Sequence, residues 1–267
     1  MGKPGGEVWL EYERRWMQMW RRVGDDYRLN RAIGSYYFIR AQSHGNEVAS
    51  FEKAMEWFGR NLQKNPRDKE SMRDMALVHK HLINPKDGKG ALLHAGEALR
   101  LDRQRLKEDA TDAGARVDLG FSLVAYANAL EWAGDRTGAE KYFEEGHELR
   151  KAMAQADPSN VFARQSLLYP MRAWAGLMLA KKHWEKAKEL LVEEVEWLRK
   201  FGVEFSAGVE MELALYRGRL EEGLGGEGCQ EYRRAGEWRK KAGASYRWAM
   251  QGQEELLGSM LRRCGVE

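Results

Sequence analysis

Apolar residues recur every three or four positions through most of the chain, which is the spacing of one face of an α-helix. The segment that begins at Ala115 shows this spacing clearly, because Leu119, Leu123, Tyr126 and Leu130 follow one another at steps of four, three and four residues. Polar and charged residues fill the positions between such apolar stripes along the chain. The pattern therefore predicts helices that each bury one face against a neighbour.

The interruptions of this pattern also recur. At five places a polar turn residue is followed, four positions later, by a residue that is small or that the crossing of two helices can accommodate. These five residues are Ser50, Ala91, Ala139, Ala187 and Glu231. The steps between these places are 41, 48, 48 and 44 residues, so we predict five helix-turn-helix units over residues 26–243. Their approximate bounds are 26–66, 67–110, 111–158, 159–202 and 203–243, and segments 1–25 and 244–267 are predicted to be capping helices.

Composition supports an all-α fold. Only 17 of the 267 residues are Val, Ile or Thr, the side chains that suit a pleated sheet. Aromatic residues make up 10% of the chain, which is more than a disordered segment carries. Lys and Arg number 44 against 41 Asp and Glu, and the net charge of +3 implies no polyanionic partner.

The two cysteines give no framework. Cys229 and Cys264 lie 35 positions apart without a CxxC or a nearby His pair, so the sequence suggests neither a zinc site nor a disulfide framework. A reducing cytoplasm is therefore the expected location. We expect no targeting segment at the N-terminus and no membrane span, since the longest uncharged stretch, 119–130, has 12 residues.

The third unit resembles the consensus of the tetratricopeptide repeat family. The matching positions are Leu123, Tyr126, Ala127, Leu130, Gly134, Ala139, Phe143 and Gly146, followed by Asp157-Pro158. More narrowly, ADPSN at residues 156–160 and RDMALVHKHL at 73–82 are similar to the carboxy-terminal repeat regions of bacterial eukaryote-like serine/threonine kinases. The repeat period is longer than the ~34 residues of the family, so we expect longer helices.

The resemblance implies a right-handed α-solenoid that acts as a non-enzymatic scaffold and binds a peptide or a partner protein in its concave groove. A component of a kinase signalling system is the partner that the narrower similarity suggests. The chain itself contains neither an HRD nor a DFG motif, so it is not expected to be a kinase.

The resemblance also assigns residues to the groove. These are Arg73, Ala76 and Lys80 in the second unit, Phe121, Val124, Asn128, Glu131 and Trp132 in the third, and Arg172 and Gly176 in the fourth. Charge-assisted hydrogen bonds from Arg73, Lys80, Asn128 and Arg172 would suit a carboxylate. The alternative is that these side chains are solvated or covered by neighbouring helices.

Motifs that suggest other chemistry have simpler explanations. The sequence GLGGEG at 223–228 satisfies GxGxxG but follows a helix rather than a strand. His79 and His81 are two positions apart and so face different sides of a helix. We expect no enzyme, no cofactor and no metal site. Pro170 predicts a kink or a break in the fourth unit.

A second class of function remains open at this point. The first helix is basic, with Arg14, Arg15, Arg21 and Arg22 interleaved with tryptophans. Such a helix is an alternative site for nucleic acid.

Overall fold

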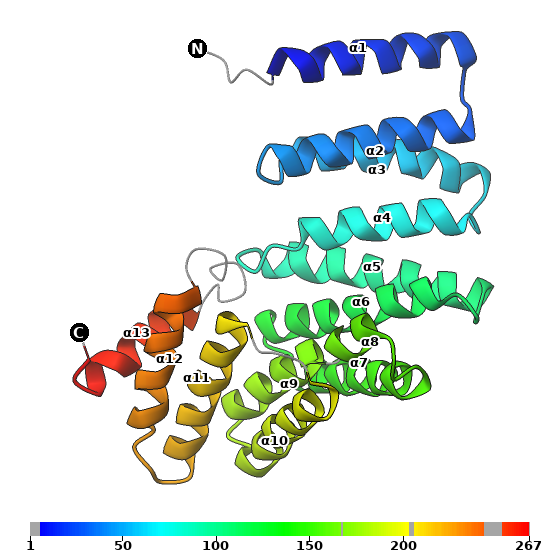
Figure 1. Ribbon diagram of the computed structural model, residues 1–267. Helices are drawn as coiled ribbons and strands as arrows, with labels where there is room; N and C mark the ends of the chain where they lie inside the picture. The colour runs from blue at the N-terminus through cyan, green and yellow to red at the C-terminus, as the bar shows by residue number, and fades with distance from the viewer. Residues whose placement is uncertain (1–5, 167, 203–205, 243–252, 267) are drawn as a thin grey trace. The chain divides into compact units, whose positions relative to one another are not determined.

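The protein is helical throughout the residues that the computed structural model describes, which are 6–166, 168–202, 206–242 and 253–266 (Figure 1). The helices are α1 (Gly6–Val23), α2 (Tyr27–Ser43), α3 (Val48–Lys64), α4 (Lys69–Leu82), α5 (Gly88–Glu108), α6 (Ala113–Trp132), α7 (Arg136–Ala156), α8 (Val161–Ser166), α9 (Leu168–Ala180), α10 (Trp184–Phe201), α11 (Ala207–Gly223), α12 (Cys229–Ala242) and α13 (Gln253–Arg263). The predicted all-α fold is confirmed for this part of the chain.

The chain divides into two compact units, Met1–Ala139 and Glu140–Glu267. In the first unit, α2 pairs with α3 and α4 with α5, and α3 and α5 also pack against the helix that follows them (Figure 1). In the second unit, α9 pairs with α10, α11 with α12, and α12 with α13. Packing between consecutive helices is the arrangement of an α-solenoid. The boundary between the units falls within the third predicted repeat, and the repeat bounds themselves stay a prediction.

Short-range hydrogen bonds explain where several helices begin. Asp26, Asp68, Asp87 and Asp112 precede α2, α4, α5 and α6, and each side chain accepts a hydrogen bond from the backbone N–H three residues later. An aspartate in this position satisfies one of the N–H groups that the first turn leaves without a partner. These caps depend on neighbours in the sequence alone.

Small residues lie where paired helices cross. Ala91, Ala95 and Ala98 are completely buried on α5, and Gly34 of α2 lies against Phe58 of α3. A Cβ atom at position 34 would come within 2.5 Å of the Phe58 ring, so only glycine allows this approach. The spacing of small residues in the sequence therefore reports the crossing points.

The N-terminal helix packs on the first hairpin through tryptophans. Trp9, Trp16 and Trp20 lie partly buried against the apolar core between α2 and α3. The Trp20 ring meets Trp57 edge-on at 5.6 Å, and the Tyr36 hydroxyl donates a hydrogen bond to the backbone carbonyl of Trp9. The helix therefore covers part of the α2–α3 core, and its role as a capping helix stays a prediction.

Pro170 lies near the start of α9, and the kink or break predicted there stays a prediction. The first helix predicted for the fourth unit is recorded as two helices, α8 and α9, and residue 167 between them lies outside the described residues.

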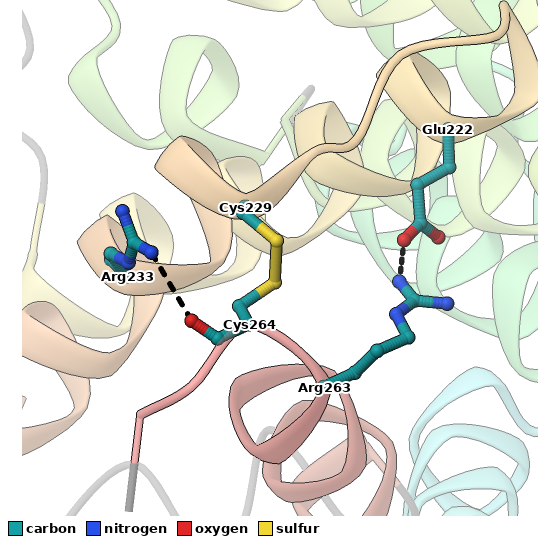
Figure 2. Close-up of a disulfide and its surroundings, with 5 residues drawn as sticks. All are labelled: Glu222, Cys229, Arg233, Arg263 and Cys264. Carbon is teal, nitrogen blue, oxygen red and sulfur yellow. Dashed lines mark hydrogen bonds and ion pairs between the residues drawn. A yellow bond between two sulfur atoms is a disulfide. The ribbon is translucent and has the colours of Figure 1, made fainter.

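The prediction for the two cysteines was wrong, because Cys229 and Cys264 form a disulfide. Figure 2 shows Cys229 at the start of α12 facing Cys264 just beyond the end of α13. The α12–α13 packing brings their Cα atoms within 5.5 Å, although 35 positions separate them in the sequence. Arg233 donates a hydrogen bond to the Cys264 carbonyl at 3.1 Å, and Arg263 forms an ion pair with Glu222.

Candidate protein-interaction surfaces

The first helices of three predicted repeats are neighbours within the first unit, since α2 contacts α4 and α4 contacts α6. Charged pairs join them: Arg31 Nε of α2 lies 2.6 Å from an Asp74 oxygen of α4. One step further, Arg73 Nε of α4 lies 3.4 Å from an Asp118 oxygen of α6. These contacts fix which faces of the three helices are neighbours.

Lys80 belongs to a buried charge network rather than to an open surface. Its ammonium group donates to Asp102 at 2.7 Å and to the Asp118 backbone carbonyl at 3.2 Å. Asp102 is fully buried and also accepts from Arg105 at 3.0 Å and from Ser122 at 2.7 Å. Buried charges are tolerated when they are paired and hydrogen-bonded in this way. The network therefore joins α4, α5 and α6.

The predicted groove residues of α6 divide into two groups. Phe121 and Trp132 are large and exposed, at 37% and 42% of their surfaces. Val124 is completely buried, which corrects its assignment to the surface, and Asn128 and Glu131 are partly buried. The buried position of Val124 follows from its place on the side of α6 that packs against neighbouring helices.

Leu77 adds a surface residue that the sequence analysis missed. It is 40% exposed on α4 and lies four residues after Arg73, so the two share one face of the helix. Phe121 lies three residues after Asp118, on the α6 face that Arg73 reaches. Trp132 follows Phe121 by 11 residues, a rotation of about 20° on an α-helix. Leu77, Phe121 and Trp132 are hereafter called the α4–α6 face.

Arg172 lies on α9 in the second unit and has two internal partners. Its Nη1 donates to Glu212 at 2.9 Å, and its Nε lies 2.8 Å from Glu194. Neither Glu194 oxygen accepts a hydrogen bond from the described residues. Burial, with the Glu212 charge nearby, raises the pKa of the Glu194 carboxyl to about 8. The Arg172 and Arg217 guanidinium groups act in the opposite direction and lower this pKa, but burial outweighs them.

The residues considered for carboxylate recognition are thus not equivalent. Arg73, Lys80 and Asn128 lie in the first unit and Arg172 lies in the second. Each of the three cations already contacts a carboxylate of the protein. A ligand carboxylate would have to compete with these internal partners.

The basic N-terminal helix offers little for nucleic acid. Arg14 and Arg15 are both bonded to Glu11, at 2.8 and 2.7 Å. Trp16 and Trp20 pack toward the core and are not displayed for stacking on bases. The arrangement does not favour nucleic-acid binding.

Groups with potential for catalysis or metal binding were compared as well. His79 of α4 and His94 of α5 lie with their Nδ1 atoms 2.9 Å apart, and burial lowers the pKa of His79 to about 4. Among the described residues, no group of three or more His, Cys, Asp or Glu side chains is placed to hold a metal ion. The glycines of GLGGEG form the turn between α11 and α12, where Gly225 and Gly228 have positive φ.

A cleft in the second unit was not predicted. It lies between α10 and α11 and is lined by Lys188, Leu191, Val192, Val195, Glu196, Arg199, Arg217 and Leu220. The signal in the sequence was the run of positions 188, 191, 192, 195, 196 and 199, which is a helical stripe. Nothing in that stripe indicated that the next helix leaves it partly uncovered.

Comparisons with known proteins found a similarity to a solved structure. Neither a family profile nor a curated protein sequence matches the chain. The chain is similar to the crystal structure of a tetratricopeptide repeat protein from Parabacteroides merdae, with 16% identity, a TM-score of 0.45, and coverage of 97% of this chain and 78% of that chain. A likeness of this size carries no argument about the fold, binding or activity. Within the described parts of the chain, the helices are too short or too polar to cross a membrane.

Proposed function

We propose that the protein is a non-enzymatic scaffold that binds a peptide or a partner protein on its tetratricopeptide-like first helices. The observation that supports this proposal is the α4–α6 face, where Leu77, Phe121 and Trp132 expose 40%, 37% and 42% of their surfaces. Large exposed aromatic side chains are enriched at protein interfaces, because they bury much apolar area at little entropic cost. Arg73, exposed beside them, supplies a charged rim.

The proposed binding site for the peptide or partner protein is the concave groove that the resemblance to the tetratricopeptide repeat family implies. A component of a kinase signalling system remains the partner suggested by the similarity of residues 73–82 and 156–160. The sequence-based reason for a cytoplasmic location no longer holds, because it depended on unpaired cysteines. A disulfide is typical of an oxidising compartment.

The proposal is tested with two variants of the full chain. The first is the triple variant Leu77→Ala, Phe121→Ala and Trp132→Ala, which removes the exposed apolar surface. The control is Leu93→Ala, because Leu93 of α5 is an exposed apolar residue in the same unit, at 63%. Circular dichroism first checks that both variants keep the helical content of the wild type.

Affinity purification from cells, with quantitative mass spectrometry, then compares what each variant recovers. We expect partners bound by the wild type to be lost with the triple variant and kept with Leu93→Ala. A photo-crosslinking residue at position 132 should form adducts with the same proteins, and the same residue at 93 should not. Equal recovery by both variants would refute the proposed face.

A further inference from the structure

The cleft between α10 and α11 exists because each helix packs mainly on another partner. α10 pairs with α9, and α11 pairs with α12. The stripe of α10 that faces α11 is therefore only partly covered, and Val192 in its centre is 49% exposed. The opening lies within the second unit and is separate from the α4–α6 face.

The lining combines an apolar floor with a basic rim. Leu191, Val192, Val195 and Leu220 supply the apolar side chains. Lys188, Arg199 and Arg217 supply three positive charges against the single negative charge of Glu196. Among the described residues, Lys188 and Arg199 form no ion pair with a carboxylate, whereas Lys151, Lys181 and Arg172 of the same unit do. Arg217 lies near enough to the buried Glu194 to lower the pKa of that carboxyl.

The size of the cleft limits what it holds. Its volume is ≈ 270 Å³, at or below the lower end of the range for small-molecule sites, which is roughly 300–1,000 Å³. The space suits one or two apolar side chains of a larger partner. Exposed charges beside such a pocket select the partner by attraction of opposite sign.

The spacing of the cations suggests the form of the partner. Lys188 and Arg199 are 11 residues apart on α10, which is about 16 Å along the helix axis and nearly the same face. That distance corresponds to three helical turns. A segment that meets both cations while filling the floor between them therefore matches an amphipathic helix of similar length.

The geometry points to the α10–α11 cleft as the binding site for an acidic amphipathic helix of a partner protein. Apolar side chains of that helix enter the floor formed by Leu191, Val192, Val195 and Leu220. Its carboxylates pair with Lys188, Arg199 and Arg217 at the rim. This site does not depend on the α4–α6 face, so either surface can bind without the other.

The test uses two pools of amphipathic peptides, each about three to four helical turns long. The pools have the same apolar positions, and the remaining positions are Asp or Glu in the acidic pool and Lys or Arg in the basic pool. Fluorescence anisotropy measures their binding to the full-length protein. Two variants change the cleft. One is Val192→Asp, and the other combines Lys188→Glu with Arg199→Glu and so reverses two charges. The matched control is Lys240→Glu with Arg262→Glu, two exposed cations outside the cleft with the same change of net charge.

We expect the acidic pool to bind the wild type more tightly than the basic pool, with an affinity that falls as salt is added. Both cleft variants should weaken binding about tenfold, because two exposed ion pairs, or one filled pocket, contribute about a factor of ten in affinity. The control variant should keep the wild-type affinity. The inference is overturned by equal binding of the two pools, by undetectable binding of the acidic pool, or by cleft variants that bind like the wild type. Sedimentation at rising protein concentration tests whether a second copy of the chain occupies the cleft. Self-association that only the cleft variants abolish would identify that copy as the occupant and would also overturn the inference.

Discussion

Breaking the Cys229–Cys264 disulfide should release the C-terminal helix while leaving the rest of the second unit folded. The bond closes a loop of 35 positions, and the chain-entropy relation gives about 4 kcal/mol for a loop of that length. That free energy acts on α13, which has 11 residues and packs on α12. A helix this short is marginal by itself in water.

Noncovalent contacts of α13 set how much of this free energy is lost locally. Leu257 is 1% exposed, Leu261 lies against Gly236, and Arg263 forms an ion pair with Glu222. These contacts persist without the sulfur bond, but the released helix samples detached states that the bond forbids. A loss of about 4 kcal/mol corresponds to an increase in opening on the order of a thousandfold.

Native-state hydrogen exchange measures this opening directly. The amides of α13 should exchange up to about a thousandfold faster after reduction of the wild type or in the variant Cys229→Ser with Cys264→Ser. Amides of α9 and α10 serve as the internal reference and should exchange at unchanged rates. Trypsin should also cleave after Arg262 and Arg263 earlier in the reduced protein. Unchanged protection of α13, or an equal loss of protection in α9 and α10, would show that the bond does not act as a local clamp.

Three further predictions concern buried charged and titratable groups. Asp102→Asn should lower the free energy of unfolding by about 3–5 kcal/mol in urea titrations, because Lys80 loses its carboxylate partner and the buried Arg105 loses one of its partners. Asp109→Asn, at the exposed ion pair with Lys69, should change it much less in the same titrations. Glu194→Gln should raise stability at pH 7 by up to about 3 kcal/mol. The carboxyl of the unfolded wild type ionises near pH 4.5 and that of the folded protein near pH 8, so the wild type loses stability as the pH rises between these values. Thermal melts from pH 5 to 9 in which stability changes equally with pH for both proteins would contradict this prediction. Lowering the pH from 6.5 toward 4 should destabilise the wild type, because His79 is protonated over this range in the unfolded chain but stays neutral when buried in the folded protein. The variant His79→Gln should lose less stability over the same range in parallel thermal melts.

The candidate surfaces show where sequence reasoning succeeded and where it failed. Phe121 and Trp132 were assigned to the concave groove; both are exposed, and their part in a groove stays a prediction. Val124, three residues after Phe121, was assigned to the same surface and is buried. A rotation of a few tens of degrees decides between the two outcomes, and helical periodicity does not fix the rotation of a helix against its neighbours to that accuracy.

The sequence by itself determined the secondary structure and the local punctuation of this protein. The three- and four-residue spacing, the scarcity of β-branched residues and the aspartates that cap α2, α4, α5 and α6 act over a few positions, so they can be recognised without knowledge of the packing. Tertiary structure alone decided that Cys229 meets Cys264, that Lys80 and Arg172 are already paired, and that α10 leaves a cleft beside α11. The disulfide and the two ion pairs join residues from 22 to 40 positions apart. Their contacts depend on the angle and register at which separate helices pack, which the spacing of residues along one helix does not contain.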